Sequence, residues 1–181
     1  MRLIILHGAP AAGKFTVGQE LEKATGYKLV HIHSLYDFIE GIFGKERYET
    51  SLGVLNRASL DIFEQAARSG LPGLIYTYAE LARSDFQFPK EILARLAGLD
   101  VKIHLVHLSC DTAELHRRIA NSSRRQFAKT TSSEELDQLL TQKDYASTFP
   151  RLATLEIDTS KLSAPESAEL IARHYSLDRR G

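Results

Sequence analysis

Short runs of apolar and β-branched residues alternate along this chain with longer segments in which apolar residues recur at helical spacing. The short runs predict five strands, at Leu3–His7, Lys28–Ile32, Leu74–Tyr78, Val101–Leu108 and Thr154–Asp158. The fourth run is almost continuously apolar, as expected of a strand that is covered on both faces. This alternation is typical of βα units, so it predicts a doubly wound α/β fold with a five-stranded parallel sheet and helices on both faces.

The segments between the runs carry the signals that begin and end helices. Glycines at positions 26 and 70 end two amphipathic segments, whose apolar residues are Val17, Leu21 and Ala24 in the first and Leu52, Leu55, Leu60, Phe63 and Ala67 in the second. Two N-terminal capping boxes are predicted directly after the fourth and fifth strands, one from Asp111 with Glu114 and one from Ser163 with Glu166.

Composition narrows the class of protein. The 181 residues, 43% hydrophobic and 25% charged, predict one soluble domain over residues 1–181. Twenty-three basic residues balance twenty-three acidic ones, which disfavours a nucleic-acid partner that would need a global positive charge. The single cysteine, Cys110, excludes an internal disulfide, and no apolar run is long enough to span a membrane, so we expect a cytoplasmic protein without a membrane partner.

A glycine-rich loop follows the first predicted strand and opens the first helix. It fits the G-x-x-x-x-G-K pattern of a Walker A phosphate loop, with the residues Gly8, Ala9, Pro10, Ala11, Ala12, Gly13 and Lys14. Glycines let the backbone wrap a phosphate, the helix N-terminus attracts the anion, and the lysine adds a charge on the outer phosphates. The alternative is an ordinary glycine turn that caps a helix.

The residues after the lysine identify the type of loop. Phe15 stands where the usual pattern places a Ser or Thr that touches Mg²⁺, and Thr16 follows one place later. Gly-Ala-Pro-Ala-Ala-Gly-Lys-Phe-Thr resembles the adenylate-kinase type of loop, G-x-P-G-x-G-K-G-T. The resemblance implies a P-loop NTPase fold and an ATP site that includes Phe15 and Thr16. It also implies a Mg²⁺ ion held mainly by the nucleotide phosphates and water, with Thr16 in indirect contact.

A second signal is a basic stretch without acidic residues between Leu115 and Ser133, which contains Arg117, Arg118, Arg124, Arg125 and Lys129. Adenylate and shikimate kinases, which the chain resembles, carry an arginine-rich mobile lid between the fourth and fifth strands. The resemblance therefore implies a lid over about residues 117–130, in which Arg117 binds nucleotide and Arg124 and Arg125 stabilise the transferring phosphoryl group. The alternative is a solvated basic helix face. In related kinases the position of Asp158 and Thr159 contacts the adenine.

The acceptor is expected beyond the second and third strands, over about residues 33–70. Candidate acceptor-binding residues there and after the third strand are His31, His33, Asp37, Arg57 and Glu80. The spacing of the two histidines predicts that they share one strand face, where His33 could orient or deprotonate a hydroxyl, or both could be structural. Arg57 fits either an anionic acceptor or a surface ion pair, and Glu80 could be a strand-end acid near Mg²⁺.

These features predict ATP-dependent phosphoryl transfer to a small-molecule acceptor, with Lys14 and the lid arginines stabilising charge. The Asp-Gly and Gly-Gly-Gly signatures of the named kinases are missing, so the acceptor is not assigned as shikimate or AMP. One alternative is a nucleotide-binding switch or slow NTPase without an acceptor. Another is a kinase of nucleic-acid ends, which the zero net charge disfavours.

Overall fold

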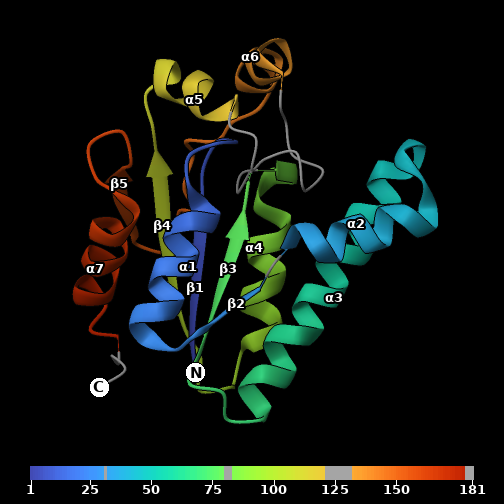
Figure 1. Ribbon diagram of the computed structural model, residues 1–181. Helices are drawn as coiled ribbons and strands as arrows, with labels where there is room; N and C mark the ends of the chain where they lie inside the picture. The colour runs from blue at the N-terminus through green and yellow to red at the C-terminus, as the bar shows by residue number, and fades with distance from the viewer. Residues whose placement is uncertain (31, 80–82, 121–131, 178–181) are drawn as a thin grey trace.

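The computed structural model describes residues 1–30, 32–79, 83–120 and 132–177. Its centre is a five-stranded sheet in the order β2-β3-β1-β4-β5 (Figure 1). The strands are β1 (Arg2–His7), β2 (Lys28–Val30), β3 (Gly73–Tyr78), β4 (Lys102–Ser109) and β5 (Thr154–Asp158). All four neighbouring pairs are parallel, which confirms the predicted sheet.

Helices cover both faces of the sheet, as the alternating pattern predicts. They are α1 (Lys14–Thr25), α2 (Ile32–Phe43), α3 (Tyr48–Arg68), α4 (Arg83–Leu96), α5 (Thr112–Ile119), α6 (Ser133–Gln142) and α7 (Ala164–His174), with a short 3₁₀ turn at Lys45–Arg47. The helix α2, the 3₁₀ turn and the start of α3 project beside the sheet (Figure 1), and we call residues 32–55 the arm.

Two apolar cores lie on opposite faces of the sheet, and β1 contributes to both. Leu3 and Ile5 pack in the core beneath α3 and α4, whereas Ile4 and Leu6 pack in the core beneath α1 and α7. The pleat of a strand produces this alternation, because successive side chains point to opposite faces. Each fully buried aliphatic side chain stabilises the fold by about 1.5–3 kcal/mol, so these two cores hold the carboxyl end of β1 in place.

The second strand is shorter than predicted. It ends at Val30, and Ile32 is already the first residue of α2. The prediction that His31 and His33 share a strand face is therefore wrong, since His33 lies in the first turn of a helix and His31 lies outside the described residues. The apolar residues Ile32, Tyr36 and Ile39 recur at helical spacing, and this period decides the structure after Val30.

Of the two predicted capping boxes, one is confirmed. Ser163 and Glu166 cap α7 reciprocally, the Ser163 hydroxyl accepting from the Glu166 N–H and the Glu166 carboxylate accepting from the Ser163 N–H at 2.8 Å. Asp111 does precede α5, but its side chain makes no capping hydrogen bond. Glu114 does not complete that box because its carboxylate binds two arginines of its own helix.

Candidate functional site

The glycine-rich loop connects the end of β1 to the start of α1, as predicted. Gly8 has φ 138°, and a Cβ atom there would stand 2.3 Å from the carbonyl oxygen of Leu108, so only glycine fits this close approach to β4. Gly13 has φ 90° and ends the loop immediately before α1. Gly13, the N-cap residue of α1, has no side chain that could accept a hydrogen bond from the first turn of the helix.

Lys14 folds back over its own loop. Its ammonium donates hydrogen bonds to the carbonyl oxygens of Gly8 at 2.6 Å and Ala9 at 2.8 Å. The charge is thus held above the loop, next to the start of α1, where the helix dipole also favours an anion. This combination can hold a phosphate group.

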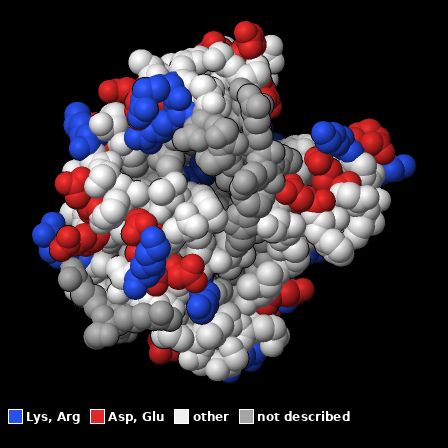
Figure 2. Space-filling view, in the orientation of Figure 1, with Lys and Arg blue, Asp and Glu red and all other residues white. Residues whose placement is uncertain are grey.

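A cavity of about 850 Å³ opens at the carboxyl ends of the strands, where Figure 2 shows the surface hollowed, with blue Lys or Arg atoms inside. Eight of the predicted site residues line this cavity: Pro10, Ala11, Gly13, Lys14, Phe15, Thr16, His33 and Thr159. The volume lies toward the upper end of the range of about 300–1,000 Å³ found for small-molecule sites. The phosphate loop and the arm therefore border one shared space.

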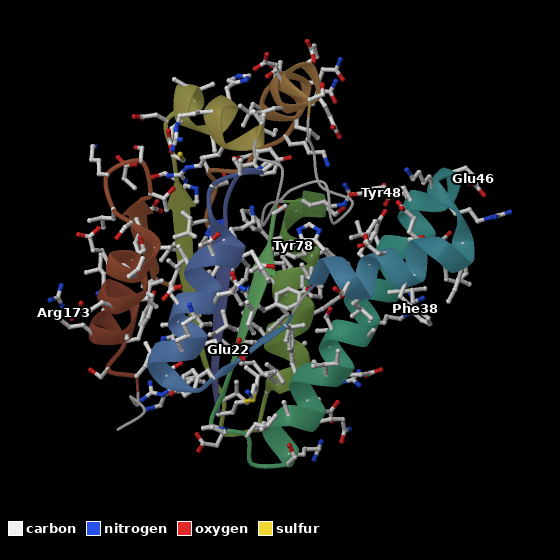
Figure 3. All side chains as sticks on the ribbon, in the orientation of Figure 1. Glu22, Phe38, Glu46, Tyr48, Tyr78 and Arg173 are labelled. Carbon is white, nitrogen blue, oxygen red and sulfur yellow. The ribbon has the colours of Figure 1, made fainter. Side chains whose placement is uncertain are left out.

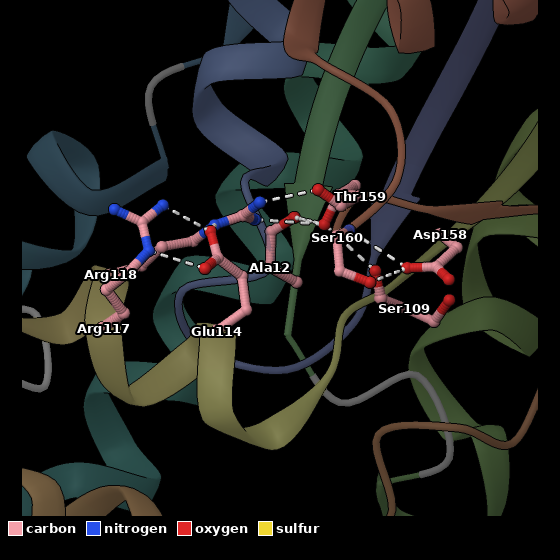
Figure 4. A network of polar contacts seen from close by, with 8 residues as sticks. All are labelled: Ala12, Ser109, Glu114, Arg117, Arg118, Asp158, Thr159 and Ser160. Carbon is pink, nitrogen blue, oxygen red and sulfur yellow. Dashed lines mark hydrogen bonds and ion pairs between the residues drawn. The ribbon is translucent and has the colours of Figure 1, made fainter.

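Arg118 reaches this cavity from α5 and is fixed on three sides (Figure 4). Its Nε donates to Glu114 at 2.7 Å, its Nη1 donates to the Thr159 hydroxyl at 3.1 Å, and its Nη2 donates to the Thr159 carbonyl at 2.6 Å. The Thr159 hydroxyl also lies 3.0 Å from the carbonyl oxygen of Ala12. These contacts tie α5 and the end of β5 to the phosphate loop, and they occupy the edges of the guanidinium plane.

Arg117, the arginine predicted to bind nucleotide, points elsewhere. Its side chain is 74% exposed, it pairs with Glu114, and it is not part of the cavity wall. Hydrogen bonds from Arg117 and Arg118 lower the pKa of Glu114 to about 2, so this carboxylate stays ionised and holds both arginines. Of the arginines in the described residues, Arg118 is the one that lines the cavity.

The cavity extends from the phosphate loop to a second wall, which we call the arm lobe. Its wall consists of Ile32, His33 and Tyr36 of α2, Tyr48, Leu52 and Leu55 of α3, and Tyr78 of β3. The rings of Tyr36 and Tyr48 meet edge to face, with centroids 6.3 Å apart. Tyr78, at the end of β3 (Figure 3), stacks on Phe88 at 5.0 Å. Sequence reasoning missed these three tyrosines.

The remaining candidates lie away from the cavity wall or outside the described residues. Asp37 lies on α2, where one carboxylate oxygen is buried without a hydrogen-bond partner among the described residues. Arg57 is exposed on α3. Asp158 accepts from the N–H of Ser160 at 3.0 Å and from Lys161 at 2.8 Å, which stabilises the turn after β5. Four candidates lie outside the described residues: His31, Glu80, Arg124 and Arg125. Most of the predicted lid lies outside them as well.

The segment after the predicted lid also contributes to the site. Glu135 and Leu139 of α6, together with Lys143 and Tyr145 after this helix, line the cavity. Helix α6 lies beside α5 above the carboxyl ends of the strands (Figure 1). Its apolar spacing predicts a helix but does not indicate a site, so only the folded chain reveals this wall.

A glycine-rich loop with a lysine, placed between the first strand and the first helix of a parallel sheet, defines a P-loop protein. The chain belongs to the family described as AAA domain, whose sequence model matches residues 3–146. No curated protein matches the sequence.

Solved structures of small-molecule kinases are similar to the whole chain. A sugar kinase from Janibacter sp. is 17% identical, with a TM-score of 0.69, and the match covers 98% of this chain and 95% of that one. A gluconokinase from Sinorhizobium meliloti is 14% identical, with a TM-score of 0.63 and coverages of 97% and 95%. A shikimate kinase from Acinetobacter baumannii is 20% identical, with a TM-score of 0.61 and coverages of 96% and 92%. At these identities the likeness shows the fold alone, and it confirms the expected P-loop fold with a five-stranded parallel sheet.

Proposed function

We propose that this protein transfers the terminal phosphoryl group of ATP to a small-molecule acceptor. The observation that carries the proposal is the shared cavity, which runs from Lys14 and the phosphate loop to the arm lobe. A nucleotide alone does not need a second wall of aromatic and aliphatic side chains. The sugar kinase, gluconokinase and shikimate kinase with the same fold support an acceptor of low molecular mass.

The nucleotide end of the site would be formed by the loop, α1 and Arg118. Lys14 would exchange the carbonyl oxygens of Gly8 and Ala9 for the outer phosphate oxygens of ATP. Because Glu114 and Thr159 bind the edges of the Arg118 guanidinium, one flat face of that group is available to stack on a base. The loop and Arg118 together would fix both ends of the nucleotide.

A magnesium ion is compatible with the residues present. In the described ranges no group of three or more His, Cys, Asp or Glu residues could hold a metal ion, so the phosphates and water would supply most ligands. Thr16 lines the cavity one residue after Phe15 and offers a hydroxyl to the ion or to its water. When bound, the ion would neutralise charge on the outer phosphates.

The transfer itself needs few protein groups. The acceptor oxygen forms a bond to the terminal phosphorus while the bond to the bridging oxygen breaks, and ADP leaves with that electron pair. The hydroxyl proton passes to water or to His33, the imidazole that lines the arm lobe. Arg124 and Arg125 stay proposed as the lid groups that stabilise the transferring charge.

The test measures ADP formation from ATP with a panel of nucleosides, sugars, sugar acids and aromatic alcohols. We expect turnover that depends on the acceptor and falls by about two to three decades in Lys14→Met, because a charge-assisted contact with the transferring group is worth about 2–4 kcal/mol. Lys23→Met is the matched control, since Lys23 is an exposed lysine on the same helix.

The same assay distinguishes phosphoryl transfer to an acceptor from the alternative function, a nucleotide-binding switch. ATP binding with slow hydrolysis that no acceptor accelerates would indicate a nucleotide-binding switch and would contradict the proposal. Unchanged turnover in Lys14→Met would contradict the assignment of the phosphate loop.

In the described part of the chain no helix is both long and apolar enough to cross a membrane.

A further inference from the structure

We propose that the acceptor is a molecule with a hydroxyl group on a flat ring system and without anionic groups, and that the arm lobe discriminates against carboxylate and phosphate groups. This inference rests on the proposed function, because it names the acceptor that the same cavity would take. It makes the gluconate and shikimate classes, which both carry a carboxylate, poor acceptors for this chain.

Charge is the first argument. Among the described residues the cationic side chains that line the cavity are Lys14, Arg118 and Lys143, which come from the phosphate loop, α5 and the segment after α6. Neither the arm nor β3 contributes a lysine or arginine to the described wall. An anionic acceptor in the arm lobe would lose its water without gaining a charged partner from that wall, which is unfavourable.

Two arginines that follow the arm in the chain do not change this balance. Arg57 is exposed and is not part of the described cavity wall. Arg83 lies over the ring of Tyr48, 5.5 Å from its centroid, and donates to the carboxylate of Glu49 at 2.5 Å. The positive charge of Arg83 is thus already compensated by Glu49, outside the lobe.

Carboxylates make the surroundings of the lobe unfavourable for anions. Burial, the charge and hydrogen bond of Glu40, and the nearby Tyr48 and Asp37 together raise the pKa of Tyr36 to about 12. One oxygen of Asp37 is itself buried without a hydrogen-bond partner in the described part of the chain. A further negative group in the lobe would meet repulsion from this side.

Shape is the second argument, and it favours a flat ring. Tyr78 is held from behind by Phe88, with centroids 5.0 Å apart and planes 28° apart, and by Tyr76 at 6.2 Å. Tyr36 and Tyr48 add two further rings, and the rest of the wall is largely aliphatic. A rigid aromatic wall of this kind gains most from a ligand that presents a planar face or edge.

The first experiment measures binding and turnover separately, with matched probes. Three sets are used, built on thymidine, adenosine and 2-phenylethanol, each with its phosphorylated form and the ring-free fragment. Dissociation constants are measured by calorimetry with a non-hydrolysable ATP analogue present, and ADP formation is measured with ATP.

We expect the neutral ring compound of at least one set to bind at least 10-fold more tightly than the other two members. The inference is overturned if nothing binds, or if in every set the phosphorylated or the ring-free member binds as tightly. Binding of the neutral ring compound without ADP formation would support the chemistry of the lobe and contradict the phosphoryl transfer, so the two failures are distinguishable.

The second experiment changes the charge of the lobe. Leu52→Lys places a cation in the wall, and Ile62→Lys places the same cation on the exposed side of the same helix. We expect Leu52→Lys to shift the affinity ratio toward the phosphorylated member by at least 10-fold and Ile62→Lys to leave it unchanged. An unchanged ratio in folded Leu52→Lys would overturn the inference.

A variant with little risk to folding keeps the test decisive. Tyr48 is 41% exposed at the cavity, so Tyr48→Leu should fold and should lose one aromatic surface. We expect several-fold weaker binding of the neutral ring compound with unchanged affinity for the ATP analogue. Equal affinity of Tyr48→Leu and the unmodified protein for that compound would count against the ring wall.

Discussion

His7 should make the protein lose stability in mild acid. It lies at the carboxyl end of β1 with no exposed surface, and its ring stacks on His107 with centroids 4.8 Å apart. Neither ring nitrogen has a hydrogen-bond partner among the described residues. Burial, together with the charges of His107 and Lys14, lowers the pKa of His7 to about 3.

The direction follows from proton uptake in the two states. A histidine in the unfolded chain has its ordinary pKa of about 6.5, so unfolded His7 takes up a proton as the pH falls below that value while native His7 stays neutral. The stabilisation is fully present above pH 6.5 and is lost as the pH falls toward 3. At pH 5 the His7 ring of the native protein is still neutral. The loss of unfolding free energy relative to pH 7 is therefore set by proton uptake in the unfolded state and amounts to about 2 kcal/mol.

The assay is urea unfolding at pH 7 and pH 5 without nucleotide, for the unmodified protein and His7→Leu. Leucine has a similar volume and leaves no hydrogen-bond partner behind, because His7 has none among the described residues. Between pH 7 and pH 5, we expect the free energy of unfolding to fall by about 2 kcal/mol less in His7→Leu than in the unmodified protein. His116→Leu, which removes a surface histidine on α5, is the control. An equally steep loss in His7→Leu would refute the reasoning.

Two further predictions concern the site. If His33 orients or deprotonates the hydroxyl, His33→Ala should lower acceptor-dependent turnover by about 100-fold and leave the ATP affinity unchanged. The control is His174→Ala, at an exposed histidine. A lower melting temperature with normal turnover would instead indicate a structural role for His33. Thr159→Val should reduce the free energy of unfolding by about 1–3 kcal/mol and weaken nucleotide binding, because it removes the hydroxyl that accepts from Arg118 Nη1 and contacts the Ala12 carbonyl of the phosphate loop. Equal effects of Thr159→Val and of Thr141→Val, on the exposed side of α6, would contradict this.

Most of the fold could be predicted because its signals are local. Strand and helix periods are visible within a dozen residues, and parallel strands need helical crossovers, so the α/β class follows from the order of the elements. The error after Val30 shows the limit of this reasoning. A short apolar run fits both periods, and the longer helical spacing of Ile32, Tyr36 and Ile39, which extends beyond the run, decides between them.

The two halves of the site differ in how far they could be predicted. The phosphate loop is contiguous in the chain, and its chemistry depends on backbone groups and one lysine, so the motif carries the whole arrangement. The arm lobe is assembled from α2, α3 and β3, and its tyrosines are separated by many residues. Their grouping depends on how the arm packs beside the sheet, which no local pattern records.

Which of Arg117 and Arg118 reaches the cavity could have been predicted, because the sequence of α5 contains a signal for it. Leu115 and Ile119 are the buried residues of α5 and lie one turn apart on the face that packs against the core. A helix turns about 100° per residue, so Arg118 lies beside that face, whereas Arg117 lies two residues from both and points outward. The helix phase thus favours Arg118 at the cavity, and it leaves Arg117 in solvent, paired with Glu114.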